Sequence, residues 1–516
     1  MTADAASLPR MADLIEHTIQ ATPDRPALGS AGGSPLSYGQ LGRLARTLAR
    51  RLAERGVARA DPIAVYSDNR PEFVLALLAC WTIGAVVVPI DPQLTGVQVD
   101  GRLAAAGTRA VLLPGHLRDS FPGDAAAWVI EVGADRSEVS VADAGRAATR
   151  MPPGEAHGKA AQDRDLALLM FTTGSTGTPK VVPLTHGNLA ASVAGIVSGY
   201  HLGPDDATLL AMPLFHGHGL IAGLLATLAS GGTAYLPAAG RFSAHAFWDE
   251  IAAARATWYT AVPTIHQILL DRAGTDYPAA DPPALRFIRS CSASLAPTVQ
   301  RRLEERFGAP VISAYGMTET AHQATTNPLP GDGVAKAGSV GLPTGLQVRI
   351  LTAAGHPAPT GETGEVCVRG PAVTDGYLDD PHDTAAAFTG GWFHTGDLGY
   401  LDPDGYLFLS GRIKELINRG GEKIAPHAVE VVLLSHPAVV DALAFGVPDA
   451  TYGEEINAAV ILGSGRHTTQ AELQQHCRSR LTAFEIPKRI YILDRFPRTA
   501  KGDGDRRALA AAVTGT

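Results

Sequence analysis

Hydrophobic residues in the first part of the chain alternate between a helical and an extended pattern. Between residues 38 and 55, leucines and alanines recur at helical spacing and predict one apolar helix face. The runs Pro62–Tyr66 and 110–113 are short and continuously apolar, which is typical of parallel strands buried on both faces. This alternation predicts an α/β fold in which helices cover a mostly parallel sheet.

The pattern changes further along the chain. Residues 119–164 are rich in Ala, Gly, Asp and Arg and show little periodicity, and we interpret them as a variable surface segment. The α/β pattern resumes at Leu166–Phe171, and beyond Gly338 short strands with glycine turns predict a small β-rich subdomain. We expect a domain of residues 1–410, followed by a smaller α+β domain of residues 411–516.

One uncharged stretch, residues 73–90, is long enough to cross a membrane. Gly84 and Pro89 interrupt it, and Ala85–Val88 has the character of a buried strand. We therefore expect a core helix, a turn and a strand here, and no membrane partner.

Composition narrows the functional classes. Hydrophobic residues make up 45% of the chain and charged residues 18%, as in a globular protein with a large core. The formal net charge of −8 argues against a broad surface for nucleic acid, so we expect small-molecule partners. No signal peptide is visible, and the cysteines lack metal-binding spacing, which predicts buried thiols in a reducing cytoplasm. The cysteines are Cys80, Cys291, Cys367 and Cys477.

The strongest chemical motif is a loop of small and hydroxyl-bearing residues directly after a predicted buried strand. Glycines let backbone N–H groups approach an anion, hydroxyls add donors, and a final lysine adds positive charge. The residues expected to bind phosphate are Thr172, Thr173, Gly174, Ser175, Thr176, Gly177 and Lys180. The spacing differs from that of the Walker A motif, so a different class of phosphate loop is expected.

Together with three later motifs, this loop resembles the signature of the adenylate-forming superfamily, which includes acyl-CoA synthetases, luciferases and peptide-synthetase adenylation domains. The later motifs are Tyr315–Glu319, Gly391–Asp397 and Gly411–Ile417, in the family's order. The resemblance covers nearly the whole chain. It implies a large N-terminal domain of two α/β subdomains and a small β subdomain, and a smaller mobile C-terminal domain that turns about a hinge at Lys414.

The resemblance also implies ATP and Mg²⁺ as cofactors and coenzyme A as co-substrate. The implied roles are adenine stacking for Tyr315, phosphate binding for Thr318, Mg²⁺ binding for Glu319, ribose binding for Asp397, ribose or phosphate binding for Arg412, and passage of coenzyme A for Gly420 and Gly421. Residue chemistry agrees with the metal assignment, because a carboxylate is a hard oxygen ligand suited to Mg²⁺.

The implied reaction has two steps. An oxygen of the acid attacks the α-phosphorus of ATP, which gives an acyl-adenylate and pyrophosphate. The small domain then rotates, and a thiol, usually that of coenzyme A, attacks the activated acyl group. The residues expected to be catalytic are His216, Thr318, Glu319 and Lys501.

Small or polar residues occupy the positions of the family's acyl pocket. They are His216, Ser290, Ser292 and His322. The neighbouring segments Thr260–His266 and Asn327–Pro330 are similar to those of oxalate–CoA ligases. We therefore expect a very small polar anion held by histidine and serine donors, with oxalate as the first candidate.

One position departs from the family. The family's C-terminal lysine bridges the acid and the α-phosphate, but Asp503 occupies that position here, and its negative charge would repel both anions. Lys501 lies two residues earlier and is our candidate substitute.

The residues leave two other functions open. Some bacterial members of the superfamily are ATP-dependent diazotases, which activate nitrite for attack by an aryl amine without coenzyme A, and nitrite would fit a small His/Ser pocket. The other possibility is a nucleotide-binding pseudoenzyme in which Asp503 marks lost catalysis. The phosphate loop, Glu319 and Asp397 argue against it.

If Lys501 has taken over the missing lysine's role, Lys501→Ala should slow adenylation by about 10²–10³-fold, because it removes a preorganised charge that meets the transferring oxygens. ATP affinity should change far less, since the contact forms mainly in the transition state. Pyrophosphate release and ATP binding measured on the same preparations check this. A change in the release rate below about threefold contradicts the displaced-lysine hypothesis.

Overall fold

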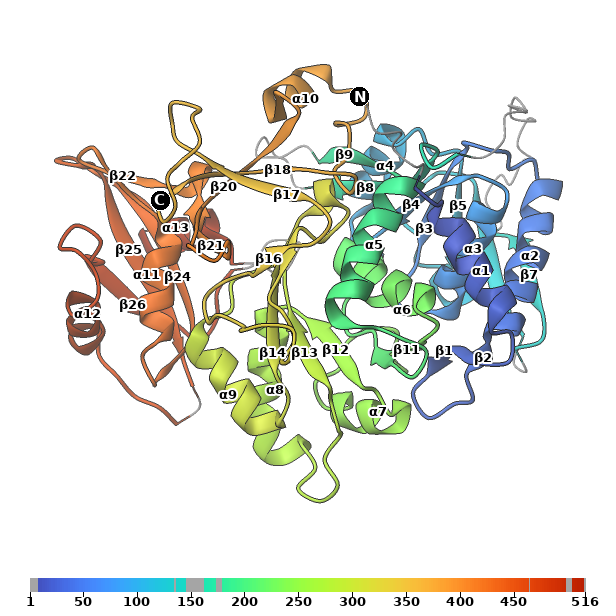
Figure 1. The fold of residues 1–516 in the computed structure, drawn as a ribbon, viewed down its shortest axis with the longest axis horizontal. Helices are drawn as coiled ribbons and strands as arrows, with labels where there is room; N and C mark the ends of the chain where they lie inside the picture. The colour runs from blue at the N-terminus through green and yellow to red at the C-terminus, as the bar shows by residue number, and fades with distance from the viewer. Residues whose placement is uncertain are drawn as a thin grey trace.

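The computed structural model describes residues 8–133, 136–144, 162–172, 179–463, 465–497 and 504–514 of the chain. Its strands form four sheets. In Figure 1 the N-terminal sheet lies at the right, the following sheet at the lower centre, and the C-terminal strands at the left.

The first sheet has seven strands in the order β7-β6-β5-β3-β4-β8-β9. Its inner strands are parallel, while β7 and β9 pair antiparallel at the two edges. The bounds are β3 Pro62–Tyr66, β4 Val86–Ile90, β5 Ala110–Pro114, β6 Ala127–Val132, β7 Val139–Asp143, β8 Leu166–Thr172 and β9 Lys180–Thr185.

The second sheet has nine strands in the order β16-β15-β14-β13-β12-β10-β11-β1-β2. Strands β10 to β14 and β1 form a parallel array that ends in antiparallel pairs. The bounds are β1 Pro26–Ser30, β2 Leu36–Ser37, β10 Ala207–Leu209, β11 Thr233–Leu236, β12 Trp258–Ala261, β13 Phe287–Ser290, β14 Val311–Tyr315, β15 Thr325–Thr326 and β16 Leu342–Pro343.

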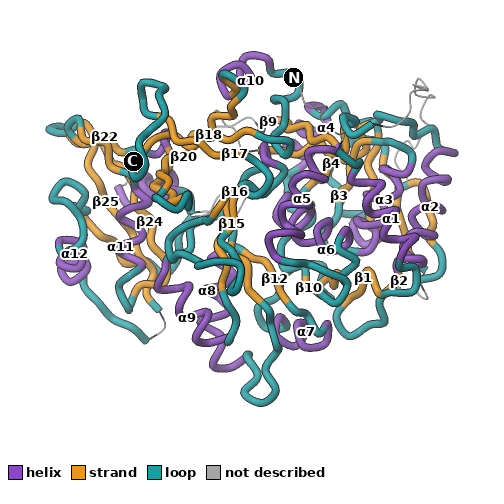
Figure 2. Tube along the Cα trace, in the orientation of Figure 1, coloured by secondary structure: helices purple, strands orange, loops and turns teal. Residues whose placement is uncertain are grey.

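Helices fill the space around and between these sheets. Figure 2 shows α1, α3, α5 and α6 grouped between β3 and β4 on one side and β1 and β10 on the other. The bounds are α1 Met11–Ala21, α2 Tyr38–Glu54, α3 Pro71–Thr82, α4 Gly96–Ala105, α5 His186–Tyr200, α6 Ala226–Ala229, α7 Phe247–Ala254, α8 Pro263–Asp276 and α9 Pro297–Phe307, with short turns η1 Gly115–Leu117 and η3 Thr318–Thr320 and a π-helical segment η2 His218–Leu225.

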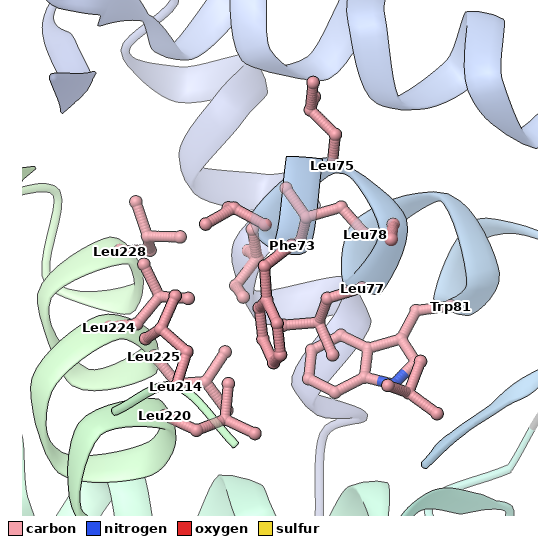
Figure 3. Close-up of a cluster of buried hydrophobic side chains, with 14 of the residues drawn as sticks. Phe73, Leu75, Leu77, Leu78, Trp81, Leu214, Leu220, Leu224, Leu225 and Leu228 are labelled. Carbon is pink, nitrogen blue, oxygen red and sulfur yellow. The ribbon is translucent and has the colours of Figure 1, made fainter. Parts of the chain in front are cut away.

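The largest hydrophobic cluster joins the two sheets through α3. Residues 73–81 of this helix are all buried, as expected for a helix that is apolar on every side and lies inside a core. Figure 3 shows Phe73 and Leu77 pointing toward Leu220 and Leu224 of η2. The packing of α3 therefore positions η2, whose first residue is His218.

A smaller antiparallel sheet and the C-terminal domain complete the fold. The small sheet contains β17 Gln347–Leu351, β18 Gly364–Arg369, β19 Phe388–Thr389, β20 Trp392–Leu401 and β21 Leu407–Arg412, with α10 Pro381–Ala387 beside it. The C-terminal sheet contains β22 Ile417–Arg419, β23 Glu422–Ile424, β24 Val439–Asp449, β25 Gly453–Leu462 and β26 Arg489–Ile492, with η4 Ile413–Glu415, α11 Pro426–Leu434, α12 Gln470–Arg478 and α13 Arg506–Thr514.

This architecture confirms the predicted fold class: a large mixed α/β N-terminal part with several sheets, followed by a smaller α+β part. The boundary at 410/411 and the mobility of the C-terminal domain stay predictions. The interpretation of residues 119–164 as a surface segment was wrong in part. This segment contains β6 and β7. Its residues Trp128, Val129 and Ile130 are buried because β6 pairs with β5 inside the first sheet.

The uncharged stretch 73–90 forms the predicted core helix, turn and strand. Among the described residues, no helix combines the length and the hydropathy that a membrane span requires. The four cysteines are free and buried, as expected.

Phe73→Ala should lower the free energy of unfolding by about 3–5 kcal/mol, because it leaves a cavity between α3 and η2 where the structure has a fully buried ring. Chemical denaturation followed by fluorescence measures the loss. The matched control is Val97→Ala on α4, where the side chain is 85% exposed and no change is expected. Equal stability of the two variants would contradict this account of the core.

Candidate active site

Two of the candidate phosphate-binding residues lie where β8 ends and β9 begins. Thr172 and Lys180 pair directly across this hairpin. Residues 173–178, which include Thr173, Gly174, Ser175, Thr176 and Gly177, lie outside the described residues, and their assignment stays a prediction. The turn η3, which carries Thr318 and Glu319, contacts both β8 and β9. The fold thus brings two motifs that are far apart in sequence to one place.

A chain of polar contacts links Lys180 to Glu319. The Lys180 ammonium lies over the ring of Tyr377, 4.6 Å from its centroid, and forms an ion pair with Asp383. The Tyr377 hydroxyl donates a hydrogen bond of 3.0 Å to Glu319 Oε1. Burial and the nearby Glu319 carboxylate raise the pKa of Tyr377, so the hydroxyl keeps its proton. A cation and a carboxylate therefore stand together beside the hairpin.

Oxygen groups at this position fit Mg²⁺ that arrives with a nucleoside triphosphate. The Glu319 carboxylate is largely buried and lies one residue from the Thr318 hydroxyl. Carboxylate and hydroxyl oxygens are hard ligands, and Mg²⁺ in nucleotide sites is usually held by one or two carboxylates together with phosphate oxygens. Glu319 therefore stays the candidate metal ligand.

Three further candidate nucleotide-binding residues meet at the small sheet. The Tyr315 hydroxyl donates to Asp397 Oδ2 at 2.5 Å, and Arg412 Nε lies 3.0 Å from Asp397 Oδ1. Asp397 and Arg412 are register partners in β20 and β21. Burial raises the pKa of Asp397, and the neighbouring Arg412 and Tyr315 act in the opposite direction. The structure thus joins residues from three sequence motifs into one hydrogen-bonded group.

The predicted acid pocket is built around a pair of stacked histidines. The rings of His218 and His322 lie 4.9 Å apart with an interplanar angle of 24°. His218 Nδ1 lies 3.1 Å from Ser292 Oγ. His216 lies two residues before His218, and a Cβ added to the intervening Gly217 would be 3.6 Å from His322 Cβ. The structure therefore brings together three of the four predicted pocket residues: His216, Ser292 and His322.

The fourth predicted residue, Ser290, is not part of this group. Successive side chains of a strand point to opposite faces, and the side chain of its neighbour Arg289 contacts His218 and His322. Ser290 therefore faces the other side of β13, where Ile288 packs in the cluster formed with α7, α8 and α9. The buried Ser290 Oγ has no hydrogen-bond partner among the described residues.

Arg289 lies at the centre of the pocket and is fully buried. Its five N–H groups point at neutral acceptors on several different elements. Nε donates to Tyr200 Oη at 2.9 Å, one terminal nitrogen reaches Thr260 Oγ1 at 3.1 Å and His218 Nε2 at 3.3 Å, and the other reaches Gln323 Oε1 at 2.9 Å and His322 Nε2 at 3.2 Å. Within the described part of the chain, no Asp or Glu forms an ion pair with Arg289. Its hydrogen bonds are complete while its charge lacks a carboxylate counter-ion.

Both histidines are held neutral. Burial lowers the pKa of His218 well below its usual value, and the neighbouring His322, Arg289, His266 and His216 lower it further. Burial and the Arg289 charge also lower the pKa of His322 well below its usual value. The pocket thus combines neutral imidazoles with one permanent positive charge.

The backbone around the pocket is strained. Ser292 has φ 72°, Ala321 has φ 47° and His322 has φ 83°, in the left-handed region that residues with a side chain rarely adopt. Such strain persists where surrounding contacts over-determine the conformation, and it concentrates at functional sites. Two of the three residues carry pocket side chains, which supports a binding role for this group.

Sequence reasoning missed Arg289 and His218. Arg289 carried a usable signal, because a charged residue inside the apolar run Phe287–Ser290 is rare in a buried strand. His218 lies two residues after His216. The start of η2 decides which of the two side chains meets His322, and the sequence alone does not show where η2 starts.

The predicted hinge and coenzyme A residues lie in the C-terminal part. Lys414 lies in η4, and Gly420 and Gly421 form the turn of the β22–β23 hairpin. Their φ angles are 61° and 97°, as a two-residue hairpin turn requires, so the turn alone explains the glycines. In Figure 1, β22 lies at the far left and β8 right of centre, so the hairpin is distant from the phosphate-binding candidates. Lys501 and Asp503 lie outside the described residues.

Known proteins resemble the chain over nearly its whole length. The AMP-binding enzyme family matches residues 15–378, and the AMP-binding enzyme C-terminal domain matches residues 428–503. An oxalate–CoA ligase of Arabidopsis thaliana is 45% identical over 511 residues, with 97% of this chain and 98% of that protein covered. A sulfoacetate–CoA ligase of Cupriavidus necator is 39% identical over 509 residues, with 97% of each chain covered.

A solved structure shows the same likeness in three dimensions. It is the O-succinylbenzoate coenzyme A synthetase from Bacillus subtilis in complex with ATP and a magnesium ion. It aligns with a TM-score of 0.80 at 30% sequence identity and covers 96% of this chain and 98% of that one.

Gly316→Ala should disrupt the pocket, because the added Cβ would lie 1.6 Å from the His322 carbonyl oxygen and backbone must move. We expect the variant to lose binding of the acid and to melt at a lower temperature. Gly274→Ala in α8 is the matched control, since nothing lies within 4 Å of its added Cβ and alanine favours a helix. Unchanged activity and melting temperature in Gly316→Ala would contradict the tight approach of these two segments.

Proposed function

The chain belongs to the AMP-binding enzyme family, as its motifs predicted, and from this membership we propose that it is an AMP-forming acid–CoA ligase for a small doubly charged acid. Oxalate is the first candidate. The acid would be activated as an acyl-adenylate and transferred to coenzyme A.

The single observation that carries the substrate class is the uncompensated charge of Arg289. A buried cation without a carboxylate partner is unfavourable, and an anion bound nearby would relieve it. In a monocarboxylate, the only negatively charged group is the carboxylate that attacks ATP. A dicarboxylate of minimal length keeps a second negative charge for the histidine end of the pocket, so Arg289 favours acids with two charges.

The named relatives are consistent with this choice. Oxalate and sulfoacetate both carry two acidic groups on a very short skeleton, and the ligases named for them are similar to this chain over nearly its whole length. The polar residues Ser292 and His322 offer hydrogen-bond donors to an anion.

The first step requires charge neutralisation and alignment. One carboxylate oxygen of the acid attacks the α-phosphorus, and the bond from that phosphorus to the bridging oxygen of pyrophosphate breaks. In this proposal Lys180 and Thr318 contact phosphate oxygens, and Asp397 accepts ribose hydroxyls; the β8–β9 pairing at Lys180 and the hydrogen bond between Tyr315 and Asp397 support these assignments. Mg²⁺ bound with ATP would neutralise phosphate charge beside Glu319. The pocket holds the second carboxylate, so the first is aimed at phosphorus.

The second step requires the thiol of coenzyme A to reach the acyl carbon. The thiol loses its proton to water, the thiolate sulfur attacks that carbon, and the bond to the AMP oxygen breaks, giving a thioester and AMP. The β22–β23 hairpin with Gly420 and Gly421 is our candidate to border the coenzyme A path. Because the hairpin lies far from β8 in Figure 1, the proposal includes a rotation of the C-terminal domain about Lys414 between the two steps.

A panel of acids tests the proposal with purified protein, ATP, Mg²⁺ and coenzyme A. Oxalate, malonate and sulfoacetate are compared with acetate and with glyoxylate, which replaces one carboxylate of oxalate by an aldehyde. The kcat/KM for oxalate should exceed that for glyoxylate by about 10²-fold, because glyoxylate lacks the second charge. Thioester formation is followed by mass and AMP by chromatography.

Equal turnover of oxalate, glyoxylate and acetate would contradict the doubly charged substrate. Absence of thioester with every acid, together with AMP formation that needs nitrite and an aryl amine, would contradict the ligase itself.

A further inference from the structure

The hydrogen-bond pattern around Arg289 determines which nitrogen of each histidine carries the proton. A guanidinium has donors and no acceptor, so every atom that it contacts must offer a lone pair. Two of those atoms are Nε2 of His218, at 3.3 Å, and Nε2 of His322, at 3.2 Å. Both histidines are neutral, since burial and the Arg289 charge lower their pKa values. A neutral imidazole whose Nε2 accepts must carry its proton on Nδ1.

For His218 the proton on Nδ1 has a defined recipient. Thr260 Oγ1 accepts from Arg289 at 3.1 Å and lies 2.6 Å from His218 Nε2. Because His218 Nε2 carries no proton in this tautomer, the threonine hydroxyl donates to it. His218 Nδ1–H then donates to Ser292 Oγ at 3.1 Å. Because Ser292 Oγ accepts this hydrogen bond, its own hydroxyl hydrogen points away from His218. Ser292 is exposed, so its hydroxyl hydrogen is free to turn toward a bound anion.

For His322 the same reasoning gives a second donor. Its Nε2 accepts from Arg289, and its ring is stacked against His218. Its Nδ1–H is therefore directed away from Arg289. The backbone of His322 has φ 83°, and its carbonyl oxygen lies close to Gly316, so the segment that carries the ring has little room to move.

We propose that Arg289 is a positioning residue that fixes His218 and His322 as Nδ1–H tautomers and so makes Ser292 Oγ–H and His322 Nδ1–H the two donors to the distal carboxylate. This inference rests on the proposed function for the identity of the anion. The tautomers themselves are a property of the protein without ligand.

Arg289 acts through its neighbours and does not touch the acid. All five of its N–H groups are used by Tyr200, Thr260, Gln323 and the two histidines. Its charge still acts on the pocket, because a charge buried in the protein interior is screened less than it would be in water. The residue therefore supplies both the orientation of the donors and the positive potential.

The groups that face this cluster set its pH dependence. The titratable groups beside Arg289 and the two histidines are Tyr200, Cys291, His216 and His266. In the wild-type protein, His218 and His322 stay neutral through the neutral range. When the Arg289 charge is removed, one cause of the lowered pKa values disappears, so both pKa values move upward.

The first experiment reads the tautomers in the ligand-free protein. Nitrogen-15 NMR of protein labelled at histidine distinguishes a protonated ring nitrogen from one with a lone pair. His218→Gln and His322→Gln each remove one set of signals and so assign them. Both residues should show Nδ1–H. Protonation of Nε2 in either residue overturns the proposal, whatever acid the enzyme uses.

The second experiment compares Arg289→Met with Arg289→Lys, and Arg50→Met on α2 is the matched control, since that arginine is 70% exposed. Arg289→Met should raise KM for oxalate by about 10²-fold and leave KM for ATP nearly unchanged. Its acid KM should also vary with pH between about 5 and 7, where the wild type is flat. Arg50→Met should behave as wild type.

Arg289→Lys separates orientation from charge. Lysine keeps the positive charge but lacks the planar fork that contacts both histidines. Mixed tautomers together with an acid KM raised at least about tenfold support the proposal. A wild-type acid KM with mixed tautomers overturns it, because charge alone would then suffice. If Arg289→Met does not fold, the histidine tautomers of the wild type and the acid KM of Arg289→Lys still test the proposal. Correct tautomers with no turnover of any acid would refute the proposed function alone.

Discussion

The buried guanidinium of Arg289 is the constraint on which the candidate active site depends. A charge inside a protein is tolerated only when its donors are satisfied, and the acceptors come from α5, η2, β12 and the segment after η3. These elements are distant in sequence, and a single side chain orders them around itself. The arrangement also keeps the histidines neutral, because burial lowers their pKa values and the Arg289 charge lowers them further.

Apolar packing supplies the frame that makes this arrangement rigid. Helix α3 lies between the two large sheets and is buried on all sides, and η2 packs against it through Leu220 and Leu224. His218 is the first residue of η2, so its position is set by hydrophobic contacts on the side away from the pocket. A site held by regular elements keeps its geometry better than one held by loops.

One short segment connects the two halves of the site. Tyr315 contacts Asp397 on the nucleotide side, Glu319 lies near the phosphate-binding hairpin, and His322 contacts Arg289 in the acid pocket. These residues follow one another within a few positions along the chain. The distance between the candidate ribose, metal and acid ligands is therefore determined largely by local backbone conformation, including the left-handed turn at Ala321 and His322.

The sequence by itself determined the buried parallel strands, the order of the motifs and the family, because short apolar runs and glycine-rich loops have local physical causes. Pro62–Tyr66 matches β3, and residues 73–90 form a helix and a strand as predicted. Segments whose burial depends on a partner were predicted less well, as β6 shows. Only the tertiary structure decided that Arg289 and not Ser290 faces the pocket, and that His218 joins His322. The physical reason is that a strand alternates its faces residue by residue, and only packing against η2 and α9 fixes which face meets the histidines.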